Sequence, residues 1–234
     1  ELDKLVRFVA KILAHREKLG FKCKILIESK PQEPMYHQYD YDTSTISGSL
    51  NTYGLADDVR VPIDLIPATL DGHRFVHEIA TAVALGIMGS IDINSGNAQN
   101  GWDTDQFNLD TRDITLAMIE LLPSGGLDTG GFNFDAKVRR QSADIEDLFY
   151  AHIGGLDALA SGLLAAADII EKGQIAAFKA ERYAGWRTEF GQFLLDENTN
   201  LTEICDRAMA EDREGRHSSG RQEYLEQLVA RSLG

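Results

Sequence analysis

The sequence has few cysteines, few prolines and a deficit of basic side chains. Two cysteines among 234 residues, Cys23 and Cys205, are too few for a disulfide framework, and their spacing fits no metal motif. We therefore expect a reducing compartment and a cytoplasmic location. Lys and Arg number 23 against 37 Asp and Glu, giving a net charge of −14. This balance disfavours partners that recognise basic patches, so we expect no nucleic acid and no anionic membrane surface.

Long apolar stretches and a recognisable start are also missing from the sequence. We expect no apolar run to reach the roughly 20 residues that span a bilayer. The chain opens at Glu1 without a methionine and without signal-peptide architecture, which we interpret as the start of a fragment. With 43% hydrophobic and 26% charged residues, the composition is that of a folded soluble domain rather than a disordered chain.

The first 143 residues alternate between short apolar runs and amphipathic stretches. Apolar residues at helical spacing predict one kind of element, and β-like runs bounded by Gly or Pro predict the other. Strands that alternate with helices in this way favour a parallel sheet with helical crossovers, an α/β fold. The predicted helices are 3–19, 42–53, 72–86 and 111–122, and the predicted strands are 23–28, 59–64, 89–94 and 130–135.

The remainder of the chain carries no strand signal. A single helical pattern runs from about residue 144 to Gly173, and two or three shorter helical segments follow. We therefore divide the chain into βα units over 1–143 and a last barrel helix plus helical oligomerisation tail over 144–234.

Each of the four predicted strands ends in a carboxylate: Glu28, Asp64, Asp92 and Asp135. In a parallel βα array the carboxyl ends of the strands meet at one edge of the sheet, where active sites lie. Four carboxylates gathered there would repel one another unless a cation held by hard oxygen ligands lay between them. The alternative, that each faces solvent by chance, is plausible for one strand but not for four in succession.

Three further residues and one histidine pair are of interest. The Asp-x-Asp of Asp103 and Asp105 could hold a cation, although alone this motif is often a solvated turn. Lys30 follows Glu28 by two residues and could stabilise a developing oxyanion, although a surface role is the usual one. His73 and His77 are four apart and form a possible ligand pair. We see no third ligand nearby in the sequence, so we expect capping or packing from these histidines.

Several uninterrupted strings resemble the xylose isomerases, specifically the carboxyl-terminal half of that family. The strings are IESKPQEP, HQYDYD, ATLDGH, HEIATA, GSIDIN, GWDTDQF, NFDAKVRRQS, AHIGGLDA and SGRQE, and together the resemblance runs from about Glu1 to Gly234. GWDTDQF and NFDAKVRRQS are the most specific of them.

The resemblance implies a fold and an activity. The fold would be a (β/α)8 TIM barrel, of which this chain supplies about four βα units and an all-helical tail. The activity would be metal-dependent aldose–ketose isomerisation, D-xylose to D-xylulose, by a metal-assisted hydride shift. The family implies two divalent cations per subunit (Mg²⁺, alternatively Mn²⁺ or Co²⁺), a sugar substrate and a homo-oligomer, dimer or tetramer, formed through the tail.

The resemblance also implies a role for each candidate residue. Glu28, Asp64, Asp92 and Asp135 look like the ligands of the first cation. Asp64, Asp103 and Asp105 look like ligands of the second, with Asp64 bridging the two. Lys30 looks like the lysine that hydrogen-bonds the substrate oxygen during the shift.

The chain departs from the family pattern around the second cation. Asp64 stands where the family has a glutamate, and Pro67 stands where it has a ligating histidine. Pro62 removes a backbone donor from a strand expected to be central. The family's ring-opening residues belong to the half of the barrel that this sequence does not contain.

Three functions therefore remain open from the sequence. The first is an isomerase, and the second is a catalytically impaired or inactive homologue that keeps the fold and partial metal binding. The third is a metal-dependent hydrolase that activates a water at the same carboxylates. Lys30 within IESKPQEP favours the isomerase over the hydrolase, and Pro67 favours an impaired homologue over a competent one.

Overall fold

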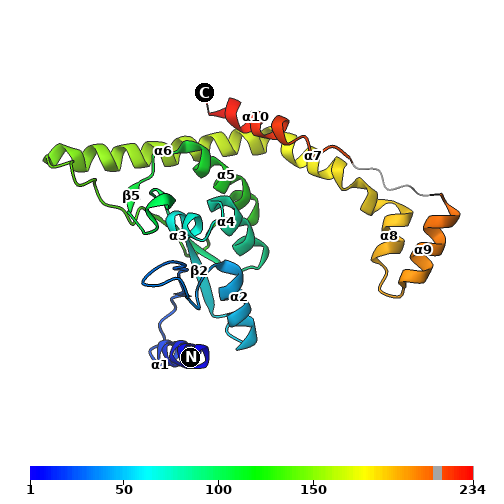
Figure 1. Ribbon diagram of the computed structural model, residues 1–234, viewed down its shortest axis with the longest axis horizontal. Coiled ribbons are helices and arrows are strands. Elements are labelled where there is room, and N and C mark those ends of the chain that lie inside the picture. Colours follow the sequence, from blue (N-terminus) through cyan, green and yellow to red (C-terminus); the bar gives the residue numbers. More distant parts are fainter. Residues whose placement is uncertain (213–217, 234) are drawn as a thin grey trace. The chain divides into compact units, whose positions relative to one another are not determined.

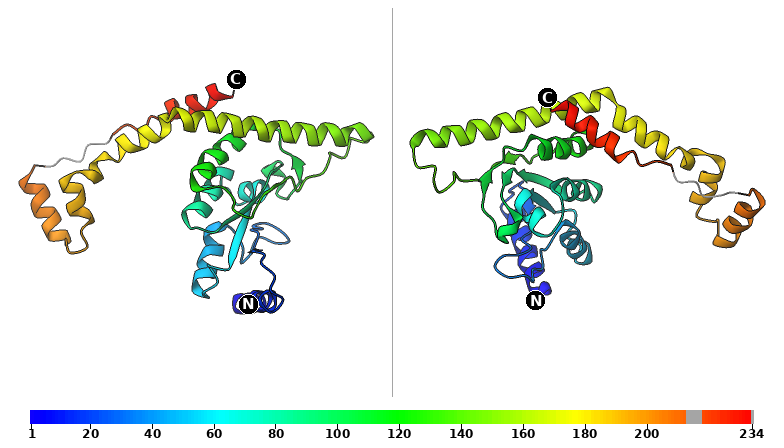
Figure 2. Two further views of the ribbon diagram at one scale, coloured as in Figure 1. Left: turned by 180° about the vertical axis from the view of Figure 1, so that it is seen from behind. Right: turned by 45° about the horizontal axis from the view of Figure 1, so that its top comes forward.

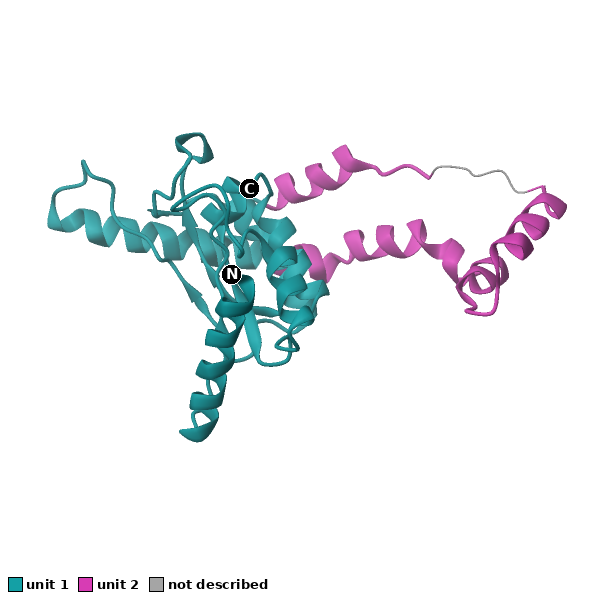
Figure 3. Cartoon of the chain, turned by 60° about the horizontal axis from the view of Figure 1, so that its bottom comes forward, with its two compact units in different colours: residues 1–166, 233 teal, residues 167–232, 234 magenta. Residues whose placement is uncertain are grey.

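The computed structural model describes residues 1–212 and 218–233, and they divide into two compact units. The first unit contains residues 1–166 and Leu233, and the second contains residues 167–232 as far as they are described, as the colours of Figure 3 show. The division falls inside one long helix, α6 (Ile145–Lys172).

A parallel sheet forms the centre of the first unit. Among the described residues its strand order is β1-β2-β3-β6, and each neighbouring pair is parallel. This confirms the predicted mixed α/β class and the order of its strands. The sheet is curled like half a barrel. The strands are β1 (Ile25–Leu26), β2 (Val59–Asp64), β3 (Met88–Asp92) and β6 (Phe132–Asn133).

The helices at residues 43–52, 75–84 and 111–121 line one side of this sheet in sequence order, and each lies in a connection between consecutive parallel strands (Figures 1 and 2). The apolar residues of β2 pack toward them, and Val59, Val61 and Ile63 are at most 2% exposed. The helices of the first unit are α1 (Leu2–Lys18), α2 (Thr43–Thr52), α3 (Leu65–Leu70), α4 (Phe75–Ala84) and α5 (Thr111–Leu121), with 3₁₀ turns η1 (Ala98–Asn100) and η2 (Leu122–Ser124).

Pro62 lies inside the central strand β2, where a proline removes a ladder donor. The register between β2 and β3 shifts between Val61 and Pro62, so the strand carries an irregularity at this residue. A β-bulge is one of the few places where a sheet accepts proline. The strand therefore continues to Asp64.

Two local elements were not predicted from the sequence. The first is α3, which begins directly after β2. The second is a short antiparallel pair between β4 (Asn94–Ser95) and β5 (Gln106–Phe107). This pair joins the two ends of the loop that carries Asp103 and Asp105.

Helix α6 packs against the first unit through glycines. A Cβ on Gly155 would lie 2.8 Å from a ring carbon of Phe134, and one on Gly162 would lie 2.5 Å from Ile114. The helix can approach this closely because those positions carry no side chain. Other apolar residues of α6 are exposed instead, among them Phe149 (65%) and Ile153 (55%).

The expectation that no apolar stretch reaches a bilayer-spanning length is wrong for α6. At 28 residues it is long and apolar enough to cross a membrane by length and composition alone. One such helix is weak evidence, because the core helix of a soluble protein passes the same test; in α6, 33% of the apolar window is buried.

The second unit is helical throughout its described residues, as the sequence predicts. Its helices bury few residues of their own; α7 and α9 have none that is buried. Helix α9 begins with a capping box of Asn200 and Glu203, and Arg207 lies over the ring of Phe193 at 4.7 Å. Beyond the end of α6 its elements are α7 (Gln174–Arg182), η3 (Ala184–Arg187), α8 (Glu189–Leu195), α9 (Leu201–Ala210) and α10 (Gln222–Ser232).

Candidate metal centre

Three carboxylates meet at the carboxyl ends of neighbouring strands. One ligand oxygen each of Glu28, Asp64 and Asp92 can be chosen so that all three atoms lie within 4.8 Å of one another. The register explains this closeness, since Asp64 of β2 is paired directly with Asp92 of β3. Glu28 follows β1, which is the next strand in the sheet. The structure therefore brings together three of the four strand-end carboxylates identified from the sequence.

Asp64 is the most buried member, with 2% of its surface exposed. Its Oδ1 accepts a hydrogen bond from the backbone N–H of Ile66 at 2.9 Å and so caps helix α3. Its Oδ2 is buried and has no hydrogen-bond partner among the described residues. Burial raises the pKa of the Asp64 carboxyl to about 8; the Ile66 N–H opposes this shift, and the charge of Asp103 adds to it. The Asn94 side chain also favours the ionised form, and a cation at the unpartnered Oδ2 would favour it further.

The other two carboxylates respond to the same surroundings. Burial raises the pKa of Glu28; the ammonium of Lys30 opposes this shift, and Asp92 adds to it. Burial also raises the pKa of Asp92, Asp135 adds to the shift, and a hydrogen bond from the Asn133 amide opposes it. The cluster therefore resists carrying its full negative charge unless a cation is present.

Asp135 lies apart from the closest group. It is exposed, two residues beyond the end of β6, with a backbone φ of 39°. This left-handed conformation is uncommon outside glycine, although Asp tolerates it better than most residues. Asp135 is still near enough for its charge to raise the pKa of Glu28 and of Asp92.

Lysines neutralise the second acidic pair. Lys30 Nζ lies 2.8 Å from Asp103 Oδ2, and Lys137 Nζ lies 2.5 Å from Asp105 Oδ2. Asp103 Oδ1 accepts the backbone N–H of Asp105 at 3.0 Å. Burial would raise the pKa of Asp103, but its hydrogen bonds, including that from Lys30, hold it below the usual range. Both carboxylates thus already have cationic partners.

Pro67 occupies the third position of α3, after the cap Asp64. A proline costs little here because the first turn of a helix has no internal acceptor for its N–H groups. It is buried and offers no ligand atom. The donor set near Asp103 and Asp105 thus contains no nitrogen from this position.

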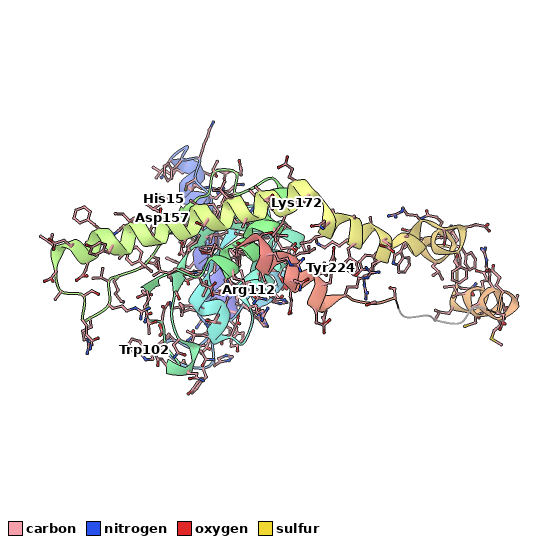
Figure 4. The ribbon with its side chains drawn as sticks, turned by 90° about the horizontal axis from the view of Figure 1, so that it is seen from above. His15, Trp102, Arg112, Asp157, Lys172 and Tyr224 are labelled. Carbon is pink, nitrogen blue, oxygen red and sulfur yellow. The ribbon has the colours of Figure 1, made fainter. Side chains whose placement is uncertain are left out.

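The structure shows residues around the site that sequence reasoning missed. Lys137 carries the clearest sequence signal, since it stands two residues after Asp135. Asn94 is fully buried, and its Oδ1 accepts the Ile66 N–H at 3.3 Å. Glu33 Oε1 accepts the backbone N–H of Asp103 at 2.7 Å. Trp102, labelled in Figure 4, directly precedes Asp103 in the loop between β4 and β5 and is 57% exposed.

Comparison with known proteins gives long matches of high identity. The xylose isomerase of Novosphingobium aromaticivorans is 52% identical over 231 residues, which is 99% of this chain and 53% of that protein. This similarity over the whole chain supports the xylose isomerase family. The xylose isomerases of Solibacter usitatus and Pseudomonas syringae pv. tomato are 53% and 50% identical over 233 residues, the whole of this chain and 53% of each relative.

The chain spans about half the length of these curated xylose isomerases. A family model described as the XylA2 C-terminal domain also matches residues 179–233, which belong to the helical second unit except for Leu233. Similarity to xylose isomerases thus extends over both units, from the strand-end carboxylates to the tail.

Proposed function

We propose that this chain supplies the cation-holding strand ends of a xylose isomerase-like aldose–ketose isomerase. One observation carries the proposal: Glu28, Asp64 and Asp92 converge within 4.8 Å, and a buried oxygen of Asp64 has no partner among the residues described. Hard carboxylate oxygens are the ligands that Mg²⁺ and Mn²⁺ prefer. When bound, such a cation supplies the positive centre that favours a hydride shift between neighbouring sugar carbons.

Lys30 has the position and protonation state of a substrate-binding group. Its side chain is about one-third exposed beside the carboxylate cluster. Burial disfavours its charge, but the hydrogen bond to Asp103 outweighs this and raises its pKa. Lys30 therefore stays protonated near neutral pH and can donate a hydrogen bond to a sugar oxygen, but it cannot act as a base.

The residues fit one cation better than two. Asp103 and Asp105 each bind a lysine ammonium, and Pro67 contributes no ligand. A second cation would have to displace both ammonium groups, so we derive no role for it. This mismatch favours the alternative of an impaired homologue with partial metal binding over a fully competent isomerase, and Lys30 beside the carboxylates favours the isomerase family over the hydrolase.

The remaining parts of the proposal concern the whole protein. We propose that the half-barrel is the carboxyl-terminal half of a (β/α)8 barrel, with the division at residue 143 separating βα units from the tail. Helices α7 and α9, which bury none of their residues, support a tail that assembles with other subunits as a dimer or tetramer. The cytoplasmic location stays a prediction.

Two measurements on the full chain test this proposal. Calorimetric titration with Mn²⁺ should show one site, which the Asp64→Asn variant should lose while Asp103→Asn keeps it. Conversion of xylose to xylulose by the chain alone should remain at background, because the ring-opening residues of the family lie outside it. The absence of Mn²⁺ binding contradicts the cation site, and substantial turnover contradicts the assignment as half a catalytic unit.

A further inference from the structure

A second group of ligand atoms lies where helices α2, α3 and α4 meet. His73 and His77 stand beside Glu78, and one ligand atom of each can be chosen so that all three lie within 4.8 Å. His73 Nδ1 lies 2.7 Å from Glu78 Oε1 and 3.4 Å from Asp71 Oδ1. His77 Nε2 lies 3.9 Å from the same oxygen of Glu78. None of these residues belongs to the strand-end cluster.

The carboxylates of this group are deeply buried. The side chains of Asp71 and Glu78 are 1% and 3% exposed. Glu78 Oε2 accepts the backbone N–H of Thr43 at 2.9 Å, and Asp71 Oδ1 accepts that of His73 at 2.8 Å. Asp71 Oδ2 is buried and has no hydrogen-bond partner among residues 1–212 and 218–233, and the same holds for Thr43 Oγ1. Unsatisfied buried oxygens of this kind require a partner.

The charges of the group do not balance. Asp71, Glu78 and the nearby Asp42 carry acidic side chains, and all three interact electrostatically with His73. These closely spaced carboxylates attract positive charge to the group.

We propose that His73, His77 and Glu78 form a binding site for a divalent cation of the zinc type, Zn²⁺ or Co²⁺, with Asp71 beside them. Two imidazole nitrogens with a carboxylate oxygen are a borderline donor set suited to these ions rather than to Mg²⁺, and a water can complete four-coordination. His77 lies in the first turn of α4, His73 lies in the turn before that helix, and Asp71 closes α3. The third ligand that the histidine pair lacked in sequence analysis is therefore Glu78, and Asp71 borders the site through His73.

The distances permit tetrahedral binding after small adjustments. Bonds of about 2.0–2.2 Å to zinc place neighbouring ligand atoms roughly 3.3–3.5 Å apart. The His77–Glu78 distance of 3.9 Å is slightly long, and Asp71 Oδ1, 3.4 Å from His73 Nδ1, is placed beside the ligands rather than among them. The 2.7 Å contact between His73 and Glu78 is a hydrogen bond that must lengthen as the ion replaces its proton. His77 has a side chain 55% exposed, so it can turn toward the ion.

Binding would also join three helices. Glu78 already holds the first N–H of α2 through Thr43, and Asp71 and His73 lie in the turn between α3 and α4. An ion bound only by the folded arrangement stabilises it by mass action. The site therefore acts as a structural clamp at the end of the half-barrel that also holds the strand-end carboxylates.

Titration of the full chain with Co²⁺ tests the proposal, because four-coordinate Co²⁺ with nitrogen ligands absorbs visible light far more strongly than six-coordinate Co²⁺ on carboxylates. We expect one equivalent to give the strong absorption. The His77→Gln variant should weaken this binding at least tenfold, and the exposed His15→Gln variant, on α1 and labelled in Figure 4, should not. Asp64→Asn should keep the absorption, which separates this site from the strand-end site.

A second measurement follows stability. Zn²⁺ should raise the melting temperature of the unaltered chain and of His15→Gln but not that of His77→Gln. Because the side chain of His77 is exposed, its replacement should not impair folding, so the missing rise reports the loss of a ligand. Absence of the strong Co²⁺ absorption, or equal binding by His77→Gln and the unaltered chain, overturns the proposal. In that case a proton shared between His73 and Glu78 takes the place of the metal.

Discussion

The buried carboxyl of Asp64 makes the stability of the metal-free chain depend on pH in a defined direction. Its pKa is about 8 in the folded chain, and an aspartate of the unfolded chain titrates near about 3.9. Between about pH 4 and pH 8 the folded chain therefore binds one proton that the unfolded chain does not. Because stability falls with pH wherever the native state holds more protons, Asp64 lowers the free energy of unfolding as pH rises through this window.

The magnitude follows from the slope of one proton. Each pH unit inside the window costs about 1.4 kcal/mol, so a rise from about pH 5.5 to about pH 7.5 costs roughly 2.7 kcal/mol. The neutral isostere Asp64→Asn cannot ionise and escapes this loss. Unfolding by urea with a chelator present, at both pH values, gives the free energies of the two proteins. Their difference should change by about that amount, in favour of the variant at the higher pH.

To first order, the other titrating groups contribute equally to the free energies of unfolding of wild type and Asp64→Asn, so their contributions cancel in the difference. A difference between wild type and Asp64→Asn that does not vary with pH would refute the reasoning, because Asp64 would then be ionised in the folded chain. Added Mg²⁺ supplies a further check at about pH 7.5. At about 100 times its dissociation constant it should return roughly 2.7 kcal/mol to the wild type and nothing to the variant.

Three further predictions concern the cation site, helix packing and assembly. The double replacement Asp64→Glu with Pro67→His should strengthen Co²⁺ binding in calorimetry. Its gain in binding free energy should exceed the sum of the gains from the two single replacements, because both new side chains would hold the same ion. A gain equal to that sum would contradict the prediction. Gly162→Ala should destabilise the folded chain by about 1–3 kcal/mol, because the added methyl group meets Ile114. The control Gly48→Ala in α2 has open space around it and should stabilise the folded chain by up to about 1 kcal/mol. Thermal melts should therefore show a lower melting temperature for the first variant and an equal or higher one for the second. The chain alone should self-associate, because two strand edges and the apolar residues Ile153 and Leu156 of α6 are exposed. Replacing both Ile153 and Leu156 by lysine should shift the mass measured by light scattering toward that of the monomer. A monomeric unaltered chain would contradict the predicted self-association.

The alternation of strands and helices was readable from the sequence because it depends on local patterns. Burying one face of a helix imposes a spacing of 3.6 residues, and a parallel strand needs a short apolar run. The long helix predicted over 144–173 is observed at Ile145–Lys172, and the four strands are observed in the predicted order. The meeting of Glu28, Asp64 and Asp92 was also predictable, because parallel strands end at the same edge of a sheet.

Tertiary structure alone decided how these carboxylates are partnered. The partners Lys30 and Asp103 are 73 residues apart, so nothing local in the sequence joins them. Asp64 caps a helix that was not predicted, since six residues with a proline show too little periodicity. The third member of the group with His73 and His77 is Glu78, which directly follows His77 in the sequence. Its burial could not be read from the sequence, because it depends on the packing of α2, whose Thr43 N–H binds Glu78. Local pattern fixed which residues reach the strand ends, and long-range packing fixed their charges and contacts, because burial and ion pairing depend on chain segments far apart.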